Sequence, residues 1–255
     1  MIYKMENPQK AEDLFKGWEE TLIWSCLQKV MGAVYANDLE NPVSAAAVIG
    51  DFCFFAGKPD KELVSNKPEG CEKDFIIMIP QNEEWAALIE ACYGEGAKKV
   101  TRYAIKKEPD VFFREKLQDI VEGLSHEYKL KLMDEELFLW CKGQEWCEDW
   151  VSQYEDYEEY RKKGLGVVIL KDGVPVSGAS SYSSYRDGIE IQIDTEKAYR
   201  RKGLASVSGA ALILECLKRG LYPSWDAQNK ESVILAEKLG YHYDHDYVAY
   251  EIWGY

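Results

Sequence analysis

The residues best suited to chemistry lie at positions 200–205, where the sequence is Arg-Arg-Lys-Gly-Leu-Ala. Three consecutive cations precede a glycine, and apolar residues recur at helical spacing directly after it. The first amides of a helix lack intrahelical partners and carry the positive end of the helix dipole, so they attract anions. Gly203 lets the backbone approach an anion without a Cβ in the way, and Ala205 keeps the next turn slim. This combination predicts a site for a diphosphate.

A strand and a helix must position this loop. Ile189, Ile191 and Ile193 alternate with polar residues, which is typical of a strand with one apolar and one polar face. After the loop, the helical pattern continues to Gly220, a residue that can end a helix. We therefore expect a strand, a basic loop and a helix over residues 188–220.

The spacing Arg200-x-x-Gly203-x-Ala205 resembles the acetyl-CoA signature of the GNAT N-acetyltransferases, Gln/Arg-x-x-Gly-x-Gly/Ala. Further features follow in that family's order: a strand at 222–226, the pair Asn229 and Ser232, and Ala-Glu-Lys-Leu-Gly-Tyr at 236–241. The longer run is similar to the subgroup that includes the zwittermicin A resistance acetyltransferase. The resemblance implies an α/β (α+β) protein with the GNAT fold, in which helices flank a mixed, mostly antiparallel central sheet.

The resemblance also implies a set of residues that bind acetyl-CoA. The loop amides would hold the pyrophosphate, and the loop comprises Arg200, Arg201, Lys202, Gly203, Leu204 and Ala205. The backbone of Ile191 and Ile193 would pair with the pantetheine arm, which Asn229 would touch, with Ser232 one turn later on the same face. The plain alternative for the two arginines is a solvated basic loop.

Acetyl transfer to an amine requires a neutral nucleophile, yet an alkylamine with a pKa of about 10.4 is almost fully charged at pH 7. A carboxylate within reach is the usual general base. Glu190 is the first candidate, because it lies on the polar face of the strand that leads to Arg200. Asp226, at the end of the next strand, is the second candidate, either as base or as a ligand of the acceptor amine. The alternative for Glu190 is an exposed strand residue without a catalytic role.

The sequence departs from the family at one catalytic position. In many relatives a tyrosine seven residues after the asparagine protonates the departing sulfur, and Ala236 stands there in this chain. Another nearby tyrosine, solvent or a backbone donor would have to replace it; the tyrosines nearby in sequence are Tyr241, Tyr243, Tyr247 and Tyr250. His242 and His245 are expected to be structural or exposed.

Composition restricts the partners. The net charge of −14, from 45 acidic and 31 basic residues, argues against a nucleic-acid binder and favours cationic partners, although it also serves solubility. No apolar run has the length of a membrane span, and the N-terminus lacks a signal-peptide pattern, so we expect a cytoplasmic protein without membrane contact. Seven scattered cysteines without a CxxC pair, and only three histidines, predict reduced, mostly buried thiols and no metal site.

Two domains are expected, at residues 1–125 and 126–255. The first is a mixed α/β domain whose element order resembles an acetyltransferase half that has lost its cofactor loop; the alternative is a subgroup-specific domain that supplies one wall of the acceptor site. The second is the acetyltransferase domain. Both interpretations predict that the halves pack together, and a homodimer is left open.

Local patterns predict further elements. A helix is expected over 8–31 and a single buried strand over 45–57. Helices are also expected over 136–140, 145–154 and 157–163, in a region rich in acidic residues, most of them on solvated helix faces. The Asp-Gly pair at 172–173 predicts a hairpin between strands at 166–171 and 174–185. Asn82 and Asn229 begin two further predicted helices.

The leading hypothesis is N-acetylation, by acetyl-CoA and direct attack in a ternary complex, of a primary amine on a small cationic molecule such as an antibiotic or a metabolite. Acetylation of a protein amine is a second enzymatic hypothesis. A non-catalytic acetyl-CoA-binding sensor or scaffold is an alternative of another class. Ala236 favours the sensor, whereas Glu190 and Asp226 favour an enzyme.

Overall fold

The computed structural model of the chain describes residues 1–68 and 74–255. The chain divides by its internal packing into two compact units, unit 1 (Met1–Arg102 with Asp246–Tyr255) and unit 2 (Tyr103–His245). This division differs from the expected boundary after residue 125. Helix α4 (Arg114–Glu122) packs on α7 (Leu204–Arg219) within unit 2, and the last residues of the chain return to unit 1.

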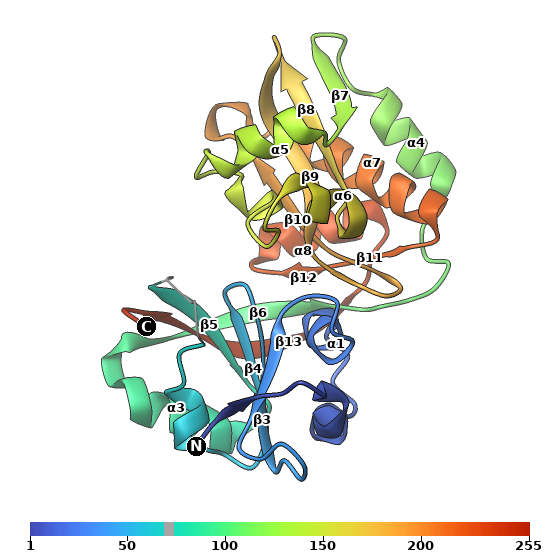
Figure 1. The fold of residues 1–255 in the computed structure, drawn as a ribbon. Helices are drawn as coiled ribbons and strands as arrows, with labels where there is room; N and C mark the ends of the chain where they lie inside the picture. The colour runs from blue at the N-terminus through green and yellow to red at the C-terminus, as the bar shows by residue number, and fades with distance from the viewer. Residues whose placement is uncertain (69–73) are drawn as a thin grey trace. The chain divides into compact units, whose positions relative to one another are not determined.

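Unit 1 is a mixed sheet with helices (Figure 1). Its elements are β1 (Tyr3–Lys4), η1 (Pro8–Phe15), α1 (Thr21–Leu27), β2 (Ala33–Ala36), β3 (Ser44–Ile49), β4 (Phe52–Gly57), α2 (Lys61–Val64), β5 (Phe75–Pro80), α3 (Glu83–Tyr93), η2 (Gly94–Gly96) and the larger parts of β6 (Ala97–Ile105) and β13 (Tyr243–Trp253). The strand order is β1-β2-β3-β4-β5-β13-β6. Strands β4 and β5 run parallel, and β1 to β4 pair in antiparallel fashion.

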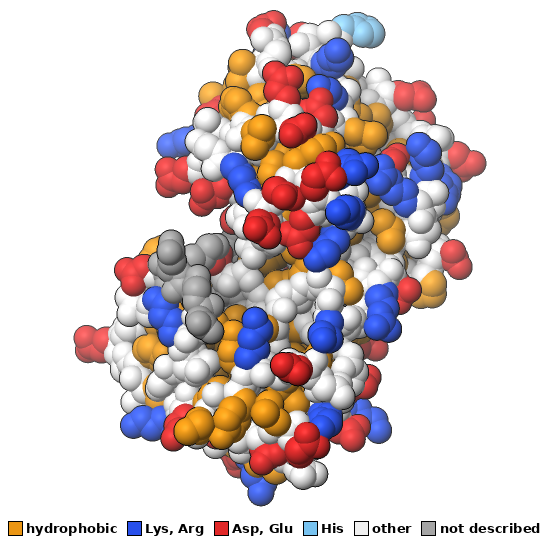
Figure 2. All heavy atoms as spheres, in the orientation of Figure 1, with side chains coloured by type: hydrophobic (Ala, Val, Ile, Leu, Met, Phe, Trp, Pro, Cys, Tyr) orange, Lys and Arg blue, Asp and Glu red, His pale blue; other side chains and the backbone are white. Residues whose placement is uncertain are grey.

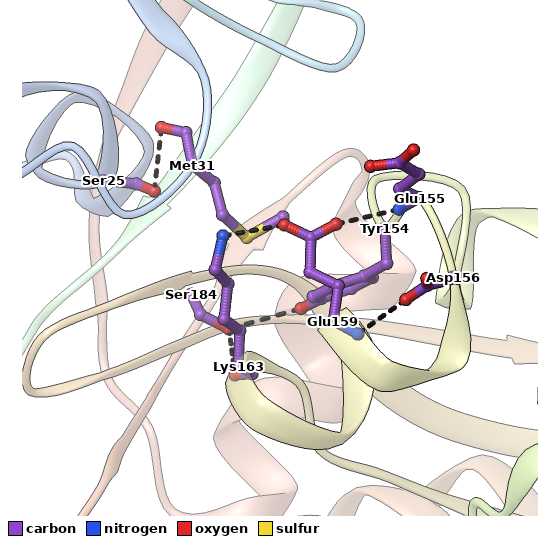
Figure 3. Close-up of polar contacts among 8 residues, drawn as sticks. All are labelled: Ser25, Met31, Tyr154, Glu155, Asp156, Glu159, Lys163 and Ser184. Atoms are coloured by element: carbon purple, nitrogen blue, oxygen red, sulfur yellow. Dashed lines mark hydrogen bonds and ion pairs between the residues drawn. The ribbon is translucent and has the colours of Figure 1, made fainter.

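Two predictions for unit 1 are wrong. The single helix over 8–31 is instead a 3-10 helix and α1, separated by a stretch in which Gly17 adopts a φ of 79°. At the end of α1 the hydroxyl of Ser25 donates to the carbonyl of Met31 at 3.3 Å (Figure 3). The single strand over 45–57 is a hairpin, because Gly50 and Asp51 form a two-residue turn between β3 and β4.

Unit 2 is a second sheet with helices on its faces (Figure 1). Besides α4 and α7, its elements are β7 (Tyr128–Leu132), α5 (Glu135–Lys142), η3 (Glu148–Trp150), α6 (Tyr157–Lys163), β8 (Gly166–Lys171), β9 (Val174–Tyr185), β10 (Gly188–Thr195), η4 (Lys197–Tyr199), β11 (Tyr222–Ser224), β12 (Asp226–Ala227) and α8 (Lys230–Leu239). The strand order is β11-β10-β9-β8-β7, antiparallel except for the parallel pair β10 and β11.

The structure confirms the hairpin at Asp172-Gly173, the helix over 204–219 and the helices capped by Asn82 and Asn229. It corrects two predictions. Only η3, a single turn, forms within 145–154, and the strand over 222–226 breaks at Trp225 into β11 and β12. The mixed sheets with flanking helices confirm the expected α/β (α+β) class.

The two units repeat one topology. In each, four antiparallel strands are followed by a crossover, a parallel fifth strand and a helix that begins at an asparagine. Asn82 accepts from the amide of Trp85 at 3.1 Å, and Asn229 accepts from the amide of Ser232 at 2.9 Å. The crossovers differ, because the 16-residue α7 of unit 2 corresponds to the 4-residue α2 of unit 1.

The parallel strands also differ between the units. In unit 1, β4 stays paired with β5 from Phe52 to Phe55, and the amide of Gln81 continues the ladder to the carbonyl of Phe55. In unit 2, β10 pairs with β11 only over Gly188–Glu190, and β12 then pairs with β6 at residues 103 and 104. Within the described residues, the rest of β10 therefore has no strand on that edge.

Successive side chains of β10 point to opposite faces of the sheet, and the two faces have different neighbours. Ile189 and Ile191 are buried in a core cluster with residues of α7, whereas Asp194 accepts from the indole of Trp150, which belongs to η3. The apolar face of β10 thus carries α7, and its polar face carries the segment from α5 to α6.

The six cysteines in the described part of the chain are free, and all but the half-buried Cys92 are buried. This confirms the prediction for those six, while Cys71 lies outside the described residues. Across residues 1–68 and 74–255, no helix combines the length and apolarity needed to cross a membrane, and no three metal-ligating side chains gather. Figure 2 shows acidic and basic side chains intermixed on the face that it draws.

Candidate functional site

The loop before α7 has the backbone shape of an anion site. Arg201 and Gly203 adopt left-handed conformations, with φ of 61° and 81°, on either side of Lys202. Such alternation turns successive amides to one side and forms a concave nest for an anion. Among the described residues, no backbone carbonyl accepts from the amides of 201–205, while the carbonyl of Gly203 accepts from Ser206 at 3.1 Å. A Cβ built on Gly203 would have no neighbour within 4 Å, so the space in front of this glycine is open.

The side chains of the loop divide into two groups. Arg200 donates from Nε to the carbonyl of Thr195 at 3.1 Å, which ties the loop to the end of β10. Lys202 lies over the ring of Tyr199, with Nζ 4.8 Å from the centroid. Leu204 is 3% exposed and belongs to a buried apolar cluster. Leu204 can therefore reach a ligand only through its backbone, whereas the cations remain at the surface.

After the buried residue Glu190, β10 pairs with a described strand on only one of its two edges. Ile191 and Ile193 pair with β9 on one edge, and no described strand covers the other. Ile191 is buried and Ile193 is half-buried, so their side chains hold the strand on α7 while one backbone edge stays open. A ligand with amide groups can hydrogen-bond to such an edge as an added strand does.

Glu190 is the last residue of β10 that pairs with β11. Its exposed fraction is 5%, which excludes the alternative of an exposed strand residue. The register places Ser183 of β9 and Ser224 of β11 directly opposite it, so the three side chains share one face of the sheet. A bulge in which the register skips Tyr182 lies beside Glu190. Bulges of this kind re-aim side chains and are frequent next to active sites.

A row of aromatic residues borders this carboxylate. Gly188 pairs with Tyr185 on β9 and with Tyr222 on β11, on the same face as Glu190. A Cβ on Gly188 would lie 2.5 Å from Oη of Tyr185, so the phenol lies over the glycine. Burial, followed by the negative charge of Glu190, raises the pKa of Tyr185 well above its usual value. Burial, followed by the charges of Glu108 and then Glu190, raises the pKa of Tyr222 to about 12. Both phenols therefore stay protonated at neutral pH.

These two tyrosines were missed by the sequence reasoning, which looked for the phenol after the asparagine. Ala236, at that position, is fully buried in the core of unit 2. Tyr241 donates to the carbonyl of Pro223 at 2.7 Å and is buried. The alternation of residues on neighbouring strands is the signal that could have indicated Tyr185 and Tyr222.

The remaining candidates have structural contacts. Asn229 Oδ1 accepts from both the amide and the hydroxyl of Ser232, at 2.9 and 3.1 Å, so the two residues cap α8. This arrangement leaves the Asn229 amide nitrogen as the group that could donate to a ligand. Asp226 belongs to β12, which pairs with β6 instead of β10. Strand pairing therefore does not place Asp226 beside Glu190.

His242 and His245 are exposed, as expected. His242 Nδ1 lies 2.6 Å from a carboxylate oxygen of Glu108, and His245 Nδ1 lies 2.9 Å from that of Asp244. These contacts are between exposed groups of unit 2 and give neither histidine a place next to Glu190.

Asp194 is a half-buried carboxylate that the sequence reasoning did not single out. It accepts from Trp150 Nε1 at 3.1 Å and from Gln192 Nε2 at 2.9 Å. Burial raises its pKa, and these hydrogen bonds offset part of the shift. The ring of Trp150 lies on Gly178, where a Cβ would come within 2.6 Å of it. Asp194 therefore serves to hold the α5–α6 segment on the sheet.

Hydroxyls of β9 hold the same segment (Figure 3). Ser184 donates to the carbonyl of Lys163 at 2.6 Å, and Tyr154 Oη lies 3.2 Å from the Ser184 hydroxyl. On α6, Asp156 caps the amide of Glu159 at 2.8 Å, and Glu159 pairs with Lys163 at 2.7 Å. These acids, predicted to be mainly solvated, cap and pair within the segment that covers the polar face of β10.

Comparison with known proteins gives a consistent assignment. A family model described as GNAT acetyltransferase matches residues 12–250. The chain is 26% identical over 251 residues to the uncharacterized N-acetyltransferase YdfB of Bacillus subtilis, covering 90% of this chain and 89% of that one.

Solved structures give the same fold. A GCN5-related N-acetyltransferase-like protein from Streptococcus suis is 46% identical, with a TM-score of 0.91 over 97% of this chain and 98% of that one. A tandem GNAT protein from the clavulanic acid biosynthesis pathway shares the fold at 10% identity, with a TM-score of 0.53 over 100% of this chain and 99% of that one. The anion loop and the open strand edge are therefore found in a chain that belongs to the GNAT acetyltransferase family.

Proposed function

We propose that this protein is an acetyl-CoA-dependent N-acetyltransferase that acetylates a primary amine of a small cationic molecule by direct attack in a ternary complex. Membership of the family implies acetyl transfer. The proposed cofactor site and general base are supported mainly by one observation. The open edge of β10 runs from the amide nest at Arg201–Ala205 to the buried Glu190, where β10 and β11 part.

The amide nest and the strand edge fit two adjacent parts of CoA, the diphosphate and the pantetheine arm. The amides of residues 201–205 suit the diphosphate, and Arg200, Arg201 and Lys202 add positive charge around it. The backbone of Ile191 and Ile193 suits the two amides of the pantetheine arm, and Asn229 is a further proposed contact. Bound acetyl-CoA supplies an activated thioester, and the direction of β10 would aim it at Glu190.

Glu190 is the proposed general base. A carboxylate that takes the proton of the acceptor ammonium as the amine attacks contributes typically 10²–10⁴-fold to the rate. Glu190 is buried next to protonated phenols, and strand pairing places it between Ser183 and Ser224. It is therefore the carboxylate of this row of side chains across the sheet. Tyr185 is the proposed donor for the departing sulfur, because it pairs with Gly188, two residues before Glu190 on the same face of the sheet, and stays protonated. Tyr222 pairs with the same glycine, but its hydroxyl donates to the carbonyl of Lys106 at 3.3 Å and accepts from the amide of Glu108 at 3.0 Å. Asp226 is kept as a ligand of the acceptor rather than as the base.

Unit 1 is proposed to be an acetyltransferase-like half without a cofactor site. It repeats the topology of unit 2, but β4 and β5 stay paired and a four-residue helix replaces α7. The tandem protein of similar fold supports this interpretation. The acceptor is proposed to be cationic because the chain carries a net charge of −14, and the likeness to the zwittermicin A resistance subgroup suggests an antibiotic or a metabolite.

A thiol-release assay tests the proposal. The protein is incubated with acetyl-CoA and a panel of polyamines, aminoglycosides and amino acids, and CoA release is followed with a thiol reagent. At least one amine should raise release above the background, and Glu190→Gln should abolish that increase without changing the affinity for CoA. Saturable CoA binding without any stimulated release would instead support the non-catalytic sensor, which the buried Ala236 also favours.

A further inference from the structure

One buried hydroxyl of unit 2 differs from its neighbours. Ser183 is fully buried, and its Oγ has no hydrogen-bond partner among the described residues. The other buried serines of β9 all have partners: Ser177 with Thr195, Ser180 with Trp150 and Tyr160, Ser181 with Tyr154, and Ser184 with Lys163. The strand therefore satisfies every buried serine hydroxyl except the one opposite Glu190.

A buried hydroxyl without a partner destabilises a protein by about 1–3 kcal/mol, so native structures usually supply a bound water instead. A buried water needs two to four polar partners. The face around Ser183 offers them, because the register places Glu190 opposite it and Ser224 beyond, and Tyr185 lies two residues along β9. Directly opposite residues have Cβ atoms about 4.5–5.5 Å apart, a separation that one water can bridge.

We propose that Ser183 holds a water against Glu190 and that this water carries the proton of the acceptor amine to the carboxylate. The inference rests on the proposed function. In the step, the ammonium N–H bond breaks and its proton goes to the water, while the water gives one of its own protons to the Glu190 carboxylate. The products are a neutral amine, a neutral carboxylic acid and the same water. Ser183 is thus a positioning residue, since it acts through the water.

The titratable groups around Glu190 are compatible with this role. Tyr185 of β9, Tyr222 of β11 and Tyr241 after α8 all sense its charge, and burial keeps the pKa of each phenol above its usual value. Asp187, in the turn before β10, is the other acid that acts on Tyr185. Because the three phenols are protonated at neutral pH, none of them competes with the carboxylate for the proton.

The test compares Ser183→Ala with Ser180→Ala, a matched change at a buried serine of the same strand. Each purified full-length variant is measured for the pH profile of kcat with the best amine of the panel and for its melting temperature. Ser183→Ala should lower kcat at least about tenfold and move the acidic limb of the profile, with no loss of melting temperature, because no protein partner is removed. Ser180→Ala loses the contacts to Trp150 and Tyr160, so it should lower the melting temperature and keep the wild-type profile.

Three results would overturn the inference. If Ser183→Ala keeps the wild-type kcat and profile while Glu190→Gln loses activity, the water relay is wrong and the proposed function stands. If Ser183→Ala lowers the melting temperature as much as Ser180→Ala does and leaves the profile unmoved, Ser183 is only structural. If the wild-type protein itself releases no CoA with any amine, the proposed function fails, and the relay fails with it.

Discussion

Replacing Gly203 by glutamate tests the cofactor loop most sharply. Gly203 is the residue before α7, with a φ of 81° and no atom within 4 Å of a Cβ built on it. A glutamate side chain there would have open space around it, but a residue with a Cβ is strained at this φ. The variant therefore changes two quantities, the conformational free energy of the loop and the charge at the amide nest.

The two effects have different magnitudes. A residue with a Cβ in the left-handed region costs about 1–2 kcal/mol. Two like unit charges about 5 Å apart repel by about 3 kcal/mol at an effective dielectric constant of about 20. Since about 1.4 kcal/mol corresponds to a tenfold change, the charge should weaken CoA binding more than about 100-fold. Gly203→Ala, which lacks the charge, should weaken binding by only about tenfold.

The assay is a calorimetric titration with CoA at fixed ionic strength. Gly173→Glu is the matched control, because Gly173 has a φ of 83°, equally open space and a place in the β8–β9 turn. It should carry the same backbone cost in melting temperature and bind CoA with wild-type affinity. Equal affinities for Gly203→Glu and Gly173→Glu would refute the assignment of the nest.

Three further changes test other parts of the account. Glu190→Gln should lower kcat by about 10²–10⁴-fold with little change in the Kd of CoA, measured by steady-state kinetics and titration. Asn229→Ala should lower the unfolding free energy by about 1 kcal/mol, because the helix cap is lost. Asn229→Asp should keep the cap and weaken CoA binding if the side-chain amide donates to the cofactor. An unchanged Kd for CoA would mean that Asn229 serves only as a helix cap. Burial raises the folded-state pKa of Asp194, so the wild type loses stability as the pH rises from about 3.8 through the raised value. Asp194→Asn should therefore gain melting temperature relative to the wild type at neutral pH, and the difference should vanish in acid.

The sequence predicted the elements whose signals are local. The hairpin at Asp172-Gly173 and the helix from Leu204 to Arg219 follow from turn chemistry and helical spacing, and both form as predicted. The prediction of a single strand over 45–57 failed because apolar residues flank the Gly50-Asp51 pair on both sides, and this apolar run outweighed the turn signal. Periodicity alone cannot separate one long buried strand from two paired ones.

The candidate site was predictable in part for the same reason. The loop at 200–205 is contiguous in sequence, and its backbone has the expected shape of an anion site. The environment of Glu190 is built from β9, β10 and β11, and its members meet only through strand register. No pattern within one segment indicates that Ser183 and Ser224 lie opposite Glu190. The duplication of the topology was likewise only suggested by element order.

A crystal structure with bound CoA tests the central claim most directly. We predict one CoA per chain, with its diphosphate on the amides of residues 201–205, its pantetheine arm along Ile191 and Ile193, and its sulfur beside Glu190. A cofactor bound elsewhere, or a sulfur remote from Glu190 with that residue still covered by protein, would contradict it.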